Sequence, residues 1–591
     1  MTDVGGGPPA GVRRMMPGLL AESLVRHASR TAVLRAGGPA LSYRDLAAAA
    51  ADVTDLLAGE GVRTGDTVLF CGERGLGHVL TVLAAWRLGA AVAVAPPGPD
   101  ARRDSVRRRV RPRAVLDDVA GGRGVRVLGG DPGPSTRPPG AGRGRGVDGA
   151  DLAYLLPTSG TTGEPKVVAV PHGAFARRCA WAQRAYPLTP GDVVLASSSP
   201  AFDFCLWETF APLAAGASVA FAPAAAEAEP EVLAAFMLEH RVTVAHFVPS
   251  LLALFVEDGG GAALAALRLL LLGGEPLTAE LCRRVRQVSA ARLWNQYGPT
   301  ETCIDAVSHE ITDDDLATRD VPIGAPVDGA EVCVLDAAGH PVEPGGVGEL
   351  HIGGALLAWG YLGMGGRTAD QFVPAPTGPP GGRRYRSGDL VRRRHDGLLV
   401  HAGRTDQQIK IRGVRLEPTE VEAVLRAHPH VREAAVVVGA GAGHLRRLLA
   451  HVVPAGPLSG DELRAHLAAR LPAAAVPARI VLRPALPRLA SGKVDRGALA
   501  ADDGSGADDP AAPAPLDTEL QVLVGGIWSG VLNVPASASM HFFEAGGSSL
   551  TAMRAAARVR RATGRQIPVR LMFEAPVLET YAARLRDLID P

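Results

Sequence analysis

Lysine is rare in this chain, and each of its three lysines lies in a segment rich in glycine, hydroxyl or charged residues. They are Lys166 in TSGTTGEPK (158–166), Lys410 in GRTDQQIKIRG (403–413) and Lys493 in SGKVDRGAL (491–499); every other basic residue, of 62 in total, is arginine. Lysine presents a compact ammonium with three donors, whereas arginine presents a rigid planar fork, so the two are not interchangeable. We therefore expect these three positions to use the ammonium itself, in phosphate or carboxylate chemistry.

The first of these segments has the composition of a phosphate-binding loop. LPTSGTTGEPK (156–166) follows an apolar stretch and places glycine, serine and threonine before the lysine. Such a loop offers backbone N–H groups and hydroxyls to a polyphosphate, with the lysine as charge partner. It differs from a Walker loop because Lys166 follows Pro165 and precedes Val167. Taken alone, the segment fits a plain surface loop equally well.

The bulk composition describes a globular chain without a strong charge preference. It has 591 residues, of which 47% are hydrophobic and 21% charged, and a net charge of +1. This length predicts about three to five structural units, and the near-neutral charge disfavours nucleic acid or an anionic membrane as a partner. The cysteines form no CxxC pair, and MTDVGGGPPAGVRR at the start has no apolar core. We therefore expect a cytoplasmic protein without a secretory signal, disulfide framework or zinc knuckle.

Short apolar strands alternate with Ala- and Leu-rich helical stretches along most of the chain, which predicts an α/β fold with mostly parallel sheets. Later stretches predict an α+β unit, and the last ones predict a helical bundle. The expected elements are a helix and strand within 76–96, strands at Thr67–Cys71, Val193–Ala196, Val242–Phe247 and Ala434–Val438, and helices at Thr419–Ala427, Gly460–Leu471, 516–532, 549–562 and 577–588.

Composition also marks the boundaries between these parts. Residues 121–149 are rich in Gly, Arg and Pro and are expected to form a surface loop, since they hold too few apolar residues for a core. An RNA-binding role for their RGRG sequence is disfavoured because aromatic residues are not interleaved. We expect a disordered N-terminus at 1–16, a large body at 17–405, a small unit at 406–500, a linker at 501–515 and a helical bundle at 516–591.

Further motifs follow the phosphate loop in a fixed order. They are NQYGPTE (295–301), YRSGDL (385–390), GRTDQQIKIRG and SGKVDRGAL, with LSYRDL (41–46), FDFCLWETF (202–210) and GELHIGGALLAWGYL (348–362) in addition. With these motifs, residues 20–500 resemble the adenylate-forming superfamily, and most closely the adenylation domains of nonribosomal peptide synthetases. The resemblance implies a large N-terminal body of mixed β-sheets and helices at 17–405 and a small, mobile α+β subdomain at 406–500.

The resemblance implies roles for most of the motif residues in binding ATP and Mg²⁺. Thr158 and Lys166 would act with the loop on the departing pyrophosphate, and Glu301 would bind Mg²⁺. Asn295 and Tyr297 would hold the adenine, Thr300 would meet the α-phosphate, and Asp389 would take the ribose hydroxyls with Arg404 in support. The implied nucleotide-binding residues are Ser159, Gly160, Thr161, Thr162, Gly163, Asn295, Tyr297, Gly298, Thr300, Asp389 and Arg404.

Three further residues would act in catalysis through movement of the small subdomain. Lys493 would bridge the substrate carboxylate and ATP, because a carboxylate that attacks a phosphate brings two anions together. Asp406 matches the hinge of the family, where a rotation would withdraw Lys493 after adenylation. Lys410 lies near this hinge and belongs to the same group of residues.

The C-terminal segment FFEAGGSSL (542–550) resembles the attachment motif of peptidyl carrier domains. Ser549 aligns with the serine that carries 4′-phosphopantetheine, and Gly546 and Gly547 would permit a tight turn before it. Taken alone, GGSSL fits an ordinary helix cap, which is the more common use of Gly-Ser. The resemblance implies a carrier domain at 516–591 and a phosphopantetheinyl transferase as a partner.

One carboxylate predicts that the substrate is an amino acid. Asp203 fills the position that pairs with the α-amino group in relatives that activate amino acids, and a buried carboxylate without a cation would be costly. Buried polar groups in the implied pocket favour a small side chain with a hydroxyl or amide. Serine is the first choice, threonine the second and glutamate or glutamine the third. The implied pocket residues besides Asp203 are Phe204, Trp207, His246, Leu271, Gly273, Gln296, Ile304 and Asp305.

The chain has neither an HHxxxDG condensation motif nor a GxSxG thioesterase motif. We therefore expect a freestanding, monomeric adenylation–carrier didomain that activates one amino acid and holds it for a condensation or tailoring enzyme. A small MbtH-like accessory protein is a further partner that the resemblance leaves open. Three alternatives remain: an acyl-CoA-ligase-like enzyme that acts on a non-amino acid, an inactive carrier scaffold, and a nucleic-acid binder.

Overall fold

The structure, a computed structural model, divides into two units. The first consists of Met1–Thr158, Pro165–Pro223 and Leu233–Gln407, and the second of Ser159–Glu164, Ala224–Val232 and Gln408–Pro591. The described residues are 15–95, 100–118, 125–127, 147–160, 165–223, 226, 229–317, 321–375, 380–406, 408–411, 414–440, 446–489, 493–501, 515–532, 534–543, 545–547, 549–565, 567–569 and 571–589.

The largest sheet of the first unit has nine strands among the described residues, in the order β15-β14-β13-β12-β11-β9-β10-β1-β2. From β13 to β1 the neighbouring strands run parallel, and both edges end in antiparallel pairs. The strands are β1 Thr31–Arg35, β2 Leu41–Ser42, β9 Val193–Ala196, β10 Ser218–Phe221, β11 Val244–Phe247, β12 Leu269–Gly273, β13 Arg292–Tyr297, β14 Val307–Glu310 and β15 Ala325–Pro326.

A second sheet follows the order β18-β8-β7-β4-β3-β5-β6. Its strands are β3 Thr67–Cys71, β4 Ala91–Ala95, β5 Ala114–Asp118, β6 Val125–Val127, β7 Leu152–Thr158, β8 Lys166–Pro171 and β18 Gly360–Tyr361. A third sheet is antiparallel, with the order β16-β17-β20-β19 and β21 on β20. It comprises β16 Ala330–Leu335, β17 Val347–Gly354, β19 Phe372–Pro374, β20 Arg383–Arg393 and β21 Leu399–Arg404. The sheets are thus mixed, and the expectation of mostly parallel strands holds only for the interiors of the first two.

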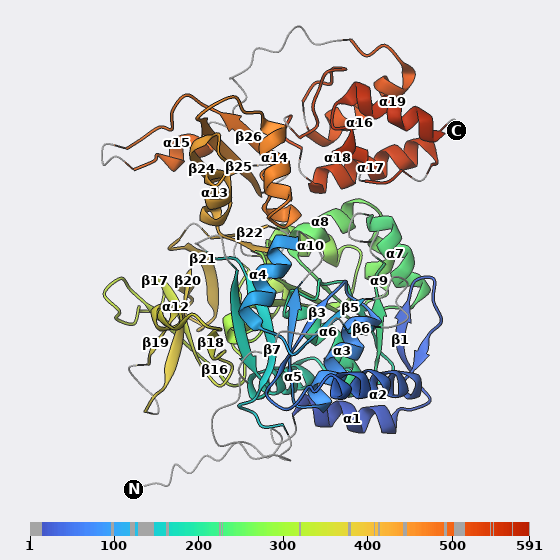
Figure 1. The fold of residues 1–591 in the computed structure, drawn as a ribbon, viewed down its shortest axis with the longest axis vertical. Helices are drawn as coiled ribbons and strands as arrows, with labels where there is room; N and C mark the ends of the chain where they lie inside the picture. The colour runs from blue at the N-terminus through green and yellow to red at the C-terminus, as the bar shows by residue number, and fades with distance from the viewer. Residues whose placement is uncertain are drawn as a thin grey trace. The chain divides into compact units, whose positions relative to one another are not determined.

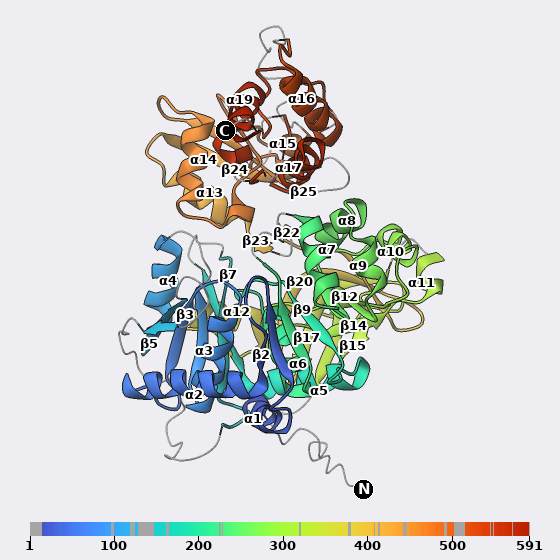
Figure 2. The ribbon, with the colours of Figure 1, turned by 90° about the vertical axis from the view of Figure 1, so that its right-hand side faces the viewer.

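One apolar core joins the two larger sheets through the helices between them. Helix α3 (Leu76–Arg87) is buried at every position from Gly77 to Trp86, as expected for a helix that is apolar on all sides. Figures 1 and 2 show α3 beside the strands of the second sheet. The other helices with residues in this unit are α1 Met16–Arg26, α2 Tyr43–Gly59, α4 Asp100–Val110, α5 His172–Ala185, α6 Phe204–Ala215, α7 Pro230–Glu239, α8 Pro249–Glu257, α9 Gly261–Ala265, α10 Ala279–Arg286, α11 Asp313–Ala317 and α12 Gly365–Gln371.

Buried His78 lies in α3, between the rings of Phe70 and Phe210, with centroid distances of 5.4 and 6.1 Å. Neither ring nitrogen has a hydrogen-bond partner among the described residues. Burial lowers the pKa of His78 from 6.5 to about 4. Between these two values the unfolded chain binds a proton that the folded chain excludes, so stability is lost as the pH falls through this window.

The free energy of unfolding of the wild-type protein falls between pH 7 and pH 5, and we expect this fall to be about 2 kcal/mol smaller in His78→Phe. The measurement is urea unfolding at the two pH values, followed by tryptophan fluorescence, and the quantity compared is the difference between them. The matched control is His340→Gln, because the side chain of His340 is 78% exposed. If His78→Phe kept the wild-type pH dependence, His78 would not be the group whose lowered pKa makes the fold less stable in acid.

The second unit contains an α+β part and a helical bundle. The α+β part has the hairpin β22 Ile409–Ile411 with β23 Val414–Leu416, and the three-stranded sheet of β24 Val431–Ala440, β25 Arg446–Pro454 and β26 Arg479–Leu482. Its helices are α13 Pro418–Arg426, α14 Gly460–Ala468 and α15 Arg496–Ala501. The bundle comprises α16 Glu519–Leu532, α17 Ser549–Thr563, α18 Leu571–Glu574 and α19 Leu578–Ile589. The bundle has its own core around Trp528, Phe542 and Tyr581.

Three sequence expectations need correction at their margins. Met16 is not disordered: it begins α1 and is 1% exposed. The segment 121–149 contains β6, which pairs antiparallel with β5, so it is not only a loop. Ala501 belongs to α15 rather than to the linker. Most of 1–16, 121–149 and 501–515 lies outside the described residues.

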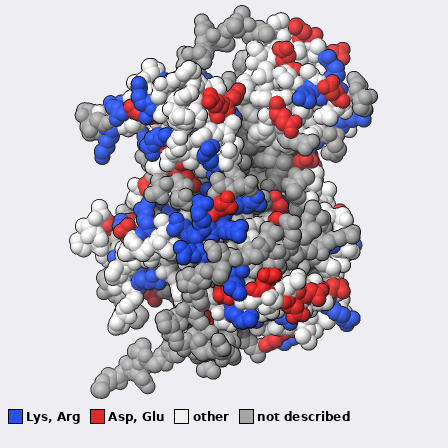
Figure 3. Space-filling model, viewed as in Figure 1, with Lys and Arg blue, Asp and Glu red and all other residues white. Residues whose placement is uncertain are grey.

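Charge is unevenly distributed despite the neutral balance. Figure 3 shows a group of Lys and Arg side chains on the face where α4 lies in Figure 1, and the last turn of α4 contains Arg107, Arg108 and Arg109. No helix among the described residues combines the length and apolarity needed to cross a membrane. All six cysteines are free, and Cys179, Cys205, Cys282 and Cys303 are buried.

Candidate active site

The two ends of the phosphate loop are held by an antiparallel strand pair. Thr158 at the end of β7 lies opposite Lys166 at the start of β8. The hydroxyl oxygen of Thr158 is buried and has no hydrogen-bond partner among the described residues. A phosphate oxygen bound there would accept a hydrogen bond from this hydroxyl. Thr161, Thr162 and Gly163 lie outside the described residues. Ser159 and Gly160 are buried within the second unit, where the Ser159 hydroxyl donates to the Arg415 carbonyl at 2.6 Å.

A buried carboxylate and an ammonium meet around one tyrosine next to this loop. Glu301, in the short 3₁₀ helix Thr300–Thr302, is fully buried and accepts a hydrogen bond from the Tyr361 hydroxyl at 2.7 Å. The Lys166 ammonium lies 5.5 Å from the centroid of the Tyr361 ring and is 7% exposed as a residue. No cluster of three or more His, Cys, Asp or Glu suited to a metal occurs in the described part of the chain. A single carboxylate fits Mg²⁺, which takes one or two protein carboxylates and completes its shell with phosphates and water.

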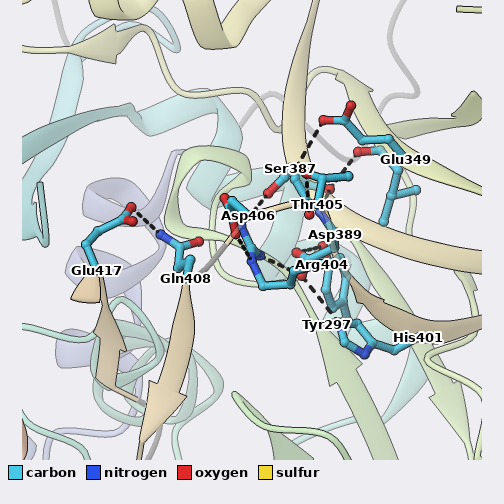
Figure 4. Close-up of polar contacts among 12 residues, drawn as sticks. Tyr297, Glu349, Ser387, Asp389, His401, Arg404, Thr405, Asp406, Gln408 and Glu417 are labelled. Carbon is cyan, nitrogen blue, oxygen red and sulfur yellow. Dashed lines mark hydrogen bonds and ion pairs between the residues drawn. The ribbon is translucent and has the colours of Figure 1, made fainter. Parts of the chain in front are cut away.

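Asp389 lies in a polar network that Figure 4 shows, together with Tyr297, Arg404 and Asp406. Asp389 lies on β20 and is 8% exposed; it accepts from the Tyr297 hydroxyl and from Arg404, each at 2.6 Å. The same guanidinium donates to Asp406 at 2.6 and 2.9 Å. Arg404 therefore joins the predicted ribose carboxylate to the predicted hinge residue.

A second carboxylate shapes the backbone in front of Asp389. Glu349 on β17 accepts from the Gly388 N–H at 3.3 Å (Figure 4). The hydrogen bond with His351 and the charge of Arg386 lower the pKa of Glu349 to about 2, against the opposing effect of burial. Gly388 has a φ of +71°, a left-handed conformation that glycine adopts without strain. Glu349 thus remains ionised at neutral pH and fixes the turn that presents Asp389.

We expect Asp389→Asn to raise KM for ATP at least about tenfold and to leave KM for the amino acid unchanged. Hydrogen bonds to a charged group are worth about 1.5–3 kcal/mol, and asparagine loses the charge that Arg404 and the ribose would share. Steady-state pyrophosphate release with each substrate varied in turn measures the effect. Asp396→Asn is the matched control, because Asp396 is an exposed carboxylate in the turn between β20 and β21. An equal rise in both KM values would contradict the assignment.

The predicted adenine residues lie on and after β13. Asn295 is 3% exposed and donates through its amide to the Pro322 carbonyl at 2.7 Å. Gly298 follows the strand, where a Cβ would lie 2.2 Å from the Ile304 carbonyl oxygen. Glycine is therefore required for the close approach of these two backbone segments. Thr300 is partly buried at the start of the 3₁₀ helix.

The predicted substrate pocket begins at the N-terminus of α6. Asp203 is the N-cap residue, and its side chain makes no capping hydrogen bond to the helix. Phe204 follows and is stacked on His246, with the ring centroids 3.7 Å apart. Trp207 lies 5.3 Å from Phe204, between centroids, and is 1% exposed. The three rings are thus in contact through Phe204, and we call them the ring wall.

The remaining pocket residues lie on neighbouring strands of the nine-stranded sheet and in the turn after β13. Leu271 and Gly273 are on β12, and Gly273 pairs with Gln296 on β13. The Gln296 amide donates to the Tyr186 hydroxyl at 2.7 Å, and its carbonyl oxygen has no hydrogen-bond partner among the described residues. Burial raises the pKa of Tyr186, so the phenol stays neutral.

Backbone strain marks the turn that carries Ile304 and Asp305. Cys303 and Ile304 have φ values of +60° and +74°, and such values are outliers for a β-branched residue such as isoleucine. Strain of this kind gathers at functional sites. Asp305 follows directly, is 4% exposed and forms an ion pair with Arg178 of α5.

Besides Ser159 and Gly160, the predicted residues Lys410, Lys493 and Ser549 lie in the second unit. Lys410 is on β22, and Lys493 is an exposed residue beside the bridge between Arg488 and Val494. Ser549 is the first residue of α17. Within the same unit, Gln408 donates to Glu417 at 2.7 Å (Figure 4).

Three residues that shape the site were not predicted from the sequence. Tyr361 joins Lys166 to Glu301, and Glu208 accepts the Ser197 and Ser198 N–H groups and lies 3.5 Å from His246. The third is Arg178. Its position was detectable, because Arg178 shares the α5 face of Ala174, Phe175 and Ala182, all buried. A charged residue on an apolar face requires a partner.

Comparisons with known proteins identify three family domains along the chain. The AMP-binding enzyme family matches residues 20–362, its C-terminal domain matches 420–493, and the phosphopantetheine attachment site matches 523–585. Phosphinothricin tripeptide synthetase PhsB of Streptomyces viridochromogenes is 38% identical over 98% of this chain and 49% of its own length. Enterobactin synthase component F of Escherichia coli is 38% identical over 74% of this chain and 34% of its own length. The chain thus spans about half or less of these relatives.

Solved structures extend the likeness to both parts of the chain. The structure of holo-PA1221, an NRPS protein containing adenylation and PCP domains bound to a vinylsulfonamide inhibitor, has a TM-score of 0.81. It is 27% identical and covers 98% of this chain and 97% of its own. Adenylation domains use ATP and Mg²⁺, and the carrier domain bears 4′-phosphopantetheine. The chain therefore belongs to the AMP-binding enzyme family, as an ATP-dependent adenylate-forming ligase of the nonribosomal peptide synthetase type joined to a carrier domain.

Proposed function

We propose that this protein activates a small hydroxyl amino acid, serine first and threonine second, and loads it as a thioester onto its own carrier domain. The observation that supports this substrate is the ring wall of Phe204, His246 and Trp207, whose bulk we infer to favour a short side chain. The Gln296 carbonyl oxygen, without a partner among the described residues, offers an acceptor to a hydroxyl. Glutamine or glutamate is the third choice, since either would have to extend past the wall.

The proposed chemistry assigns separate tasks to separate residues. Asp203 holds the substrate ammonium, and Asp389 with Tyr297 and Asn295 orients the nucleotide. Thr158 and Lys166 hold the phosphates, while Lys493 neutralises the charge that develops as the carboxylate attacks. When bound through Glu301, Mg²⁺ supplies further charge neutralisation at the phosphates. The phosphopantetheine arm on Ser549 supplies the thiol that receives the acyl group.

The proposal also names partners by their chemistry. A phosphopantetheinyl transferase must modify Ser549 before any loading, and a condensation or tailoring enzyme would use the loaded carrier. The HHxxxDG motif of condensation enzymes does not occur in this sequence. A small MbtH-like accessory protein is a candidate for the adenylation domain, and we include it in the test.

The test is amino-acid-dependent ATP–pyrophosphate exchange with the twenty standard amino acids and several aryl and fatty acids, with and without an MbtH-like protein. We expect exchange with serine or threonine, and its loss in Asp203→Ala. Exchange only with acids that lack an α-amino group would overturn the role of Asp203 and favour an acyl-CoA-ligase-like enzyme. Silence with every acid, even with the accessory protein present, would favour a carrier scaffold.

A further inference from the structure

The guanidinium of Arg178 lies at the polar end of the predicted pocket, more than a hundred residues away in sequence from the carboxylate that it binds. Arg178 is fully buried on α5, and one of its terminal nitrogens, Nη2, donates to Asp305. Its central carbon lies 5.3 Å from the ring centroid of Trp207 and 5.7 Å from those of Phe204 and Trp181. The group is therefore surrounded by the same rings that wall the pocket.

The Arg178 guanidinium also interacts with the Tyr186 hydroxyl, yet it retains nitrogens that make no hydrogen bond of good geometry. Its Nε and Nη1 atoms have no hydrogen-bond partner among the described residues. A buried donor without an acceptor is costly, and a charged one more so. The nearby Gln296 carbonyl oxygen and the Trp207 indole N–H are also without partners in the described part of the chain. This end of the pocket therefore presents several N–H donors and one acceptor.

The charge of the pair restricts what can bind there. The charges of Arg178 and Asp305 cancel. A cationic substrate side chain would therefore meet a carboxylate that is already neutralised, with a guanidinium beside it. An anionic side chain would bring a second buried carboxylate to one guanidinium, leaving an uncompensated charge. A neutral oxygen, as in a hydroxyl or amide, accepts from Arg178 without changing the net charge.

We propose that Arg178 is a specificity-determining residue, which cancels the charge of Asp305 and donates a hydrogen bond to an uncharged oxygen of the substrate side chain. This inference rests on the proposed function, because it needs an amino acid in this pocket. It extends that function by selecting uncharged acceptor-bearing side chains over lysine- or ornithine-like cations, over glutamate and over alkyl side chains of equal size.

The experiment uses ATP–pyrophosphate exchange by the full chain with serine, threonine, glutamine, glutamate, 2-aminobutyrate, 2,4-diaminobutyrate and ornithine. Arg178→Met keeps the length of the side chain and removes its charge, and it leaves Asp305 without its cation. We expect a loss of about a hundredfold or more in kcat/KM for the wild-type substrate, as in sites built around a hydrogen bond. We also expect new activity with 2,4-diaminobutyrate or ornithine, which loss of structure alone would not produce.

Two further variants keep the test decisive if Arg178→Met fails to fold. The double variant Arg178→Met/Asp305→Leu removes both buried charges; it should fold, lose the wild-type substrate, and favour 2-aminobutyrate without accepting a cation. Arg177→Met, one position earlier on α5 and only partly buried, is the matched control and should keep the wild-type profile.

Two results would overturn the inference while the proposed function stands. One is a wild-type substrate whose side chain is cationic, anionic or purely alkyl. The other is an unchanged substrate profile in a folded Arg178→Met or double variant. Absence of exchange by the wild-type protein with every amino acid would instead refute the proposed function, and this inference with it.

Discussion

Replacement of Ser549 by alanine is expected to abolish covalent loading of the carrier completely, while amino-acid-dependent ATP–pyrophosphate exchange stays at the wild-type rate. The hydroxyl is the proposed attachment point, and alanine offers no oxygen for the phosphodiester bond. Adenylation depends on residues of other parts of the chain, so the first half-reaction does not require this hydroxyl. The variant therefore separates the two half-reactions.

The backbone before Ser549 is compatible with the proposed modification. Gly546 has a φ of +99°, and a Cβ on Gly547 would lie 2.4 Å from the Phe542 carbonyl oxygen. Both positions thus require glycine for the turn that leads into α17, which Ser549 begins. The residue at the start of a helix leaves its neighbouring N–H groups without intrahelical acceptors, a setting that favours a phosphate.

The measurement is intact mass after incubation with a phosphopantetheinyl transferase, coenzyme A, ATP and the substrate. Ser548→Ala, which changes the adjacent serine of the same motif, is the matched control and should gain both the arm and the acyl group. If Ser549→Ala still gained the phosphopantetheine arm, or if only Ser548→Ala failed to gain it, the attachment point would be Ser548.

Replacement of Lys493 by alanine should lower kcat/KM for adenylation by about a hundred- to a thousandfold, equivalent to about 3–4 kcal/mol for one charge-stabilising donor. The protein should remain folded, because Lys493 is exposed within its unit and exposed truncations usually change stability by less than about 0.5 kcal/mol. The substitution should thus raise the activation free energy of adenylation and leave the free energy of unfolding nearly unchanged. Lys493→Arg should restore part of the rate, since it keeps the charge but not the compact shape.

The effect of Lys493→Ala on acyl transfer to the carrier should differ from its effect on adenylation. If Lys493 serves adenylation only, transfer of the acyl group from a supplied aminoacyl-adenylate to the holo-carrier should proceed in Lys493→Ala near the wild-type rate. Single-turnover acylation, followed by intact mass, measures it. An equal loss in both half-reactions, or a lowered melting temperature, would contradict a role confined to the first step.

Much of the fold could be predicted from the sequence because its elements have strong local patterns. The strands Thr67–Cys71 and Val193–Ala196 are confirmed at their predicted bounds, and the predicted buried helix and strand within 76–96 are α3 and β4. The four-residue helix α18 was missed, because one turn shows no periodicity. Strand β6 was missed because its backbone pairing with β5 is not visible in a segment dominated by Gly, Arg and Pro.

For the candidate site, too, residues in local motifs could be predicted from the sequence, whereas their partners from distant parts of the chain could not. Residues in ordered motifs, such as Asp389 and Lys166, were named from the sequence, and their roles remain predictions. The partners that set their chemistry come from distant parts of the chain: Arg178 meets Asp305, and Tyr361 meets Glu301. Such pairs depend on which strands and helices become neighbours in the folded body, and no local pattern encodes them.

The burial of the cysteines has a practical consequence for following the carrier during turnover. Burial raises the pKa of Cys71 to about 11 and that of Cys282 to about 12, and also raises those of Cys179, Cys205 and Cys303, so few thiolates form at neutral pH. The region 516–591 contains no cysteine. With partly exposed Cys333 changed to serine, a maleimide fluorophore should label the thiol of the phosphopantetheine arm almost alone, and acylation should protect it. Fluorescence would then report the fraction of carrier that is still unloaded.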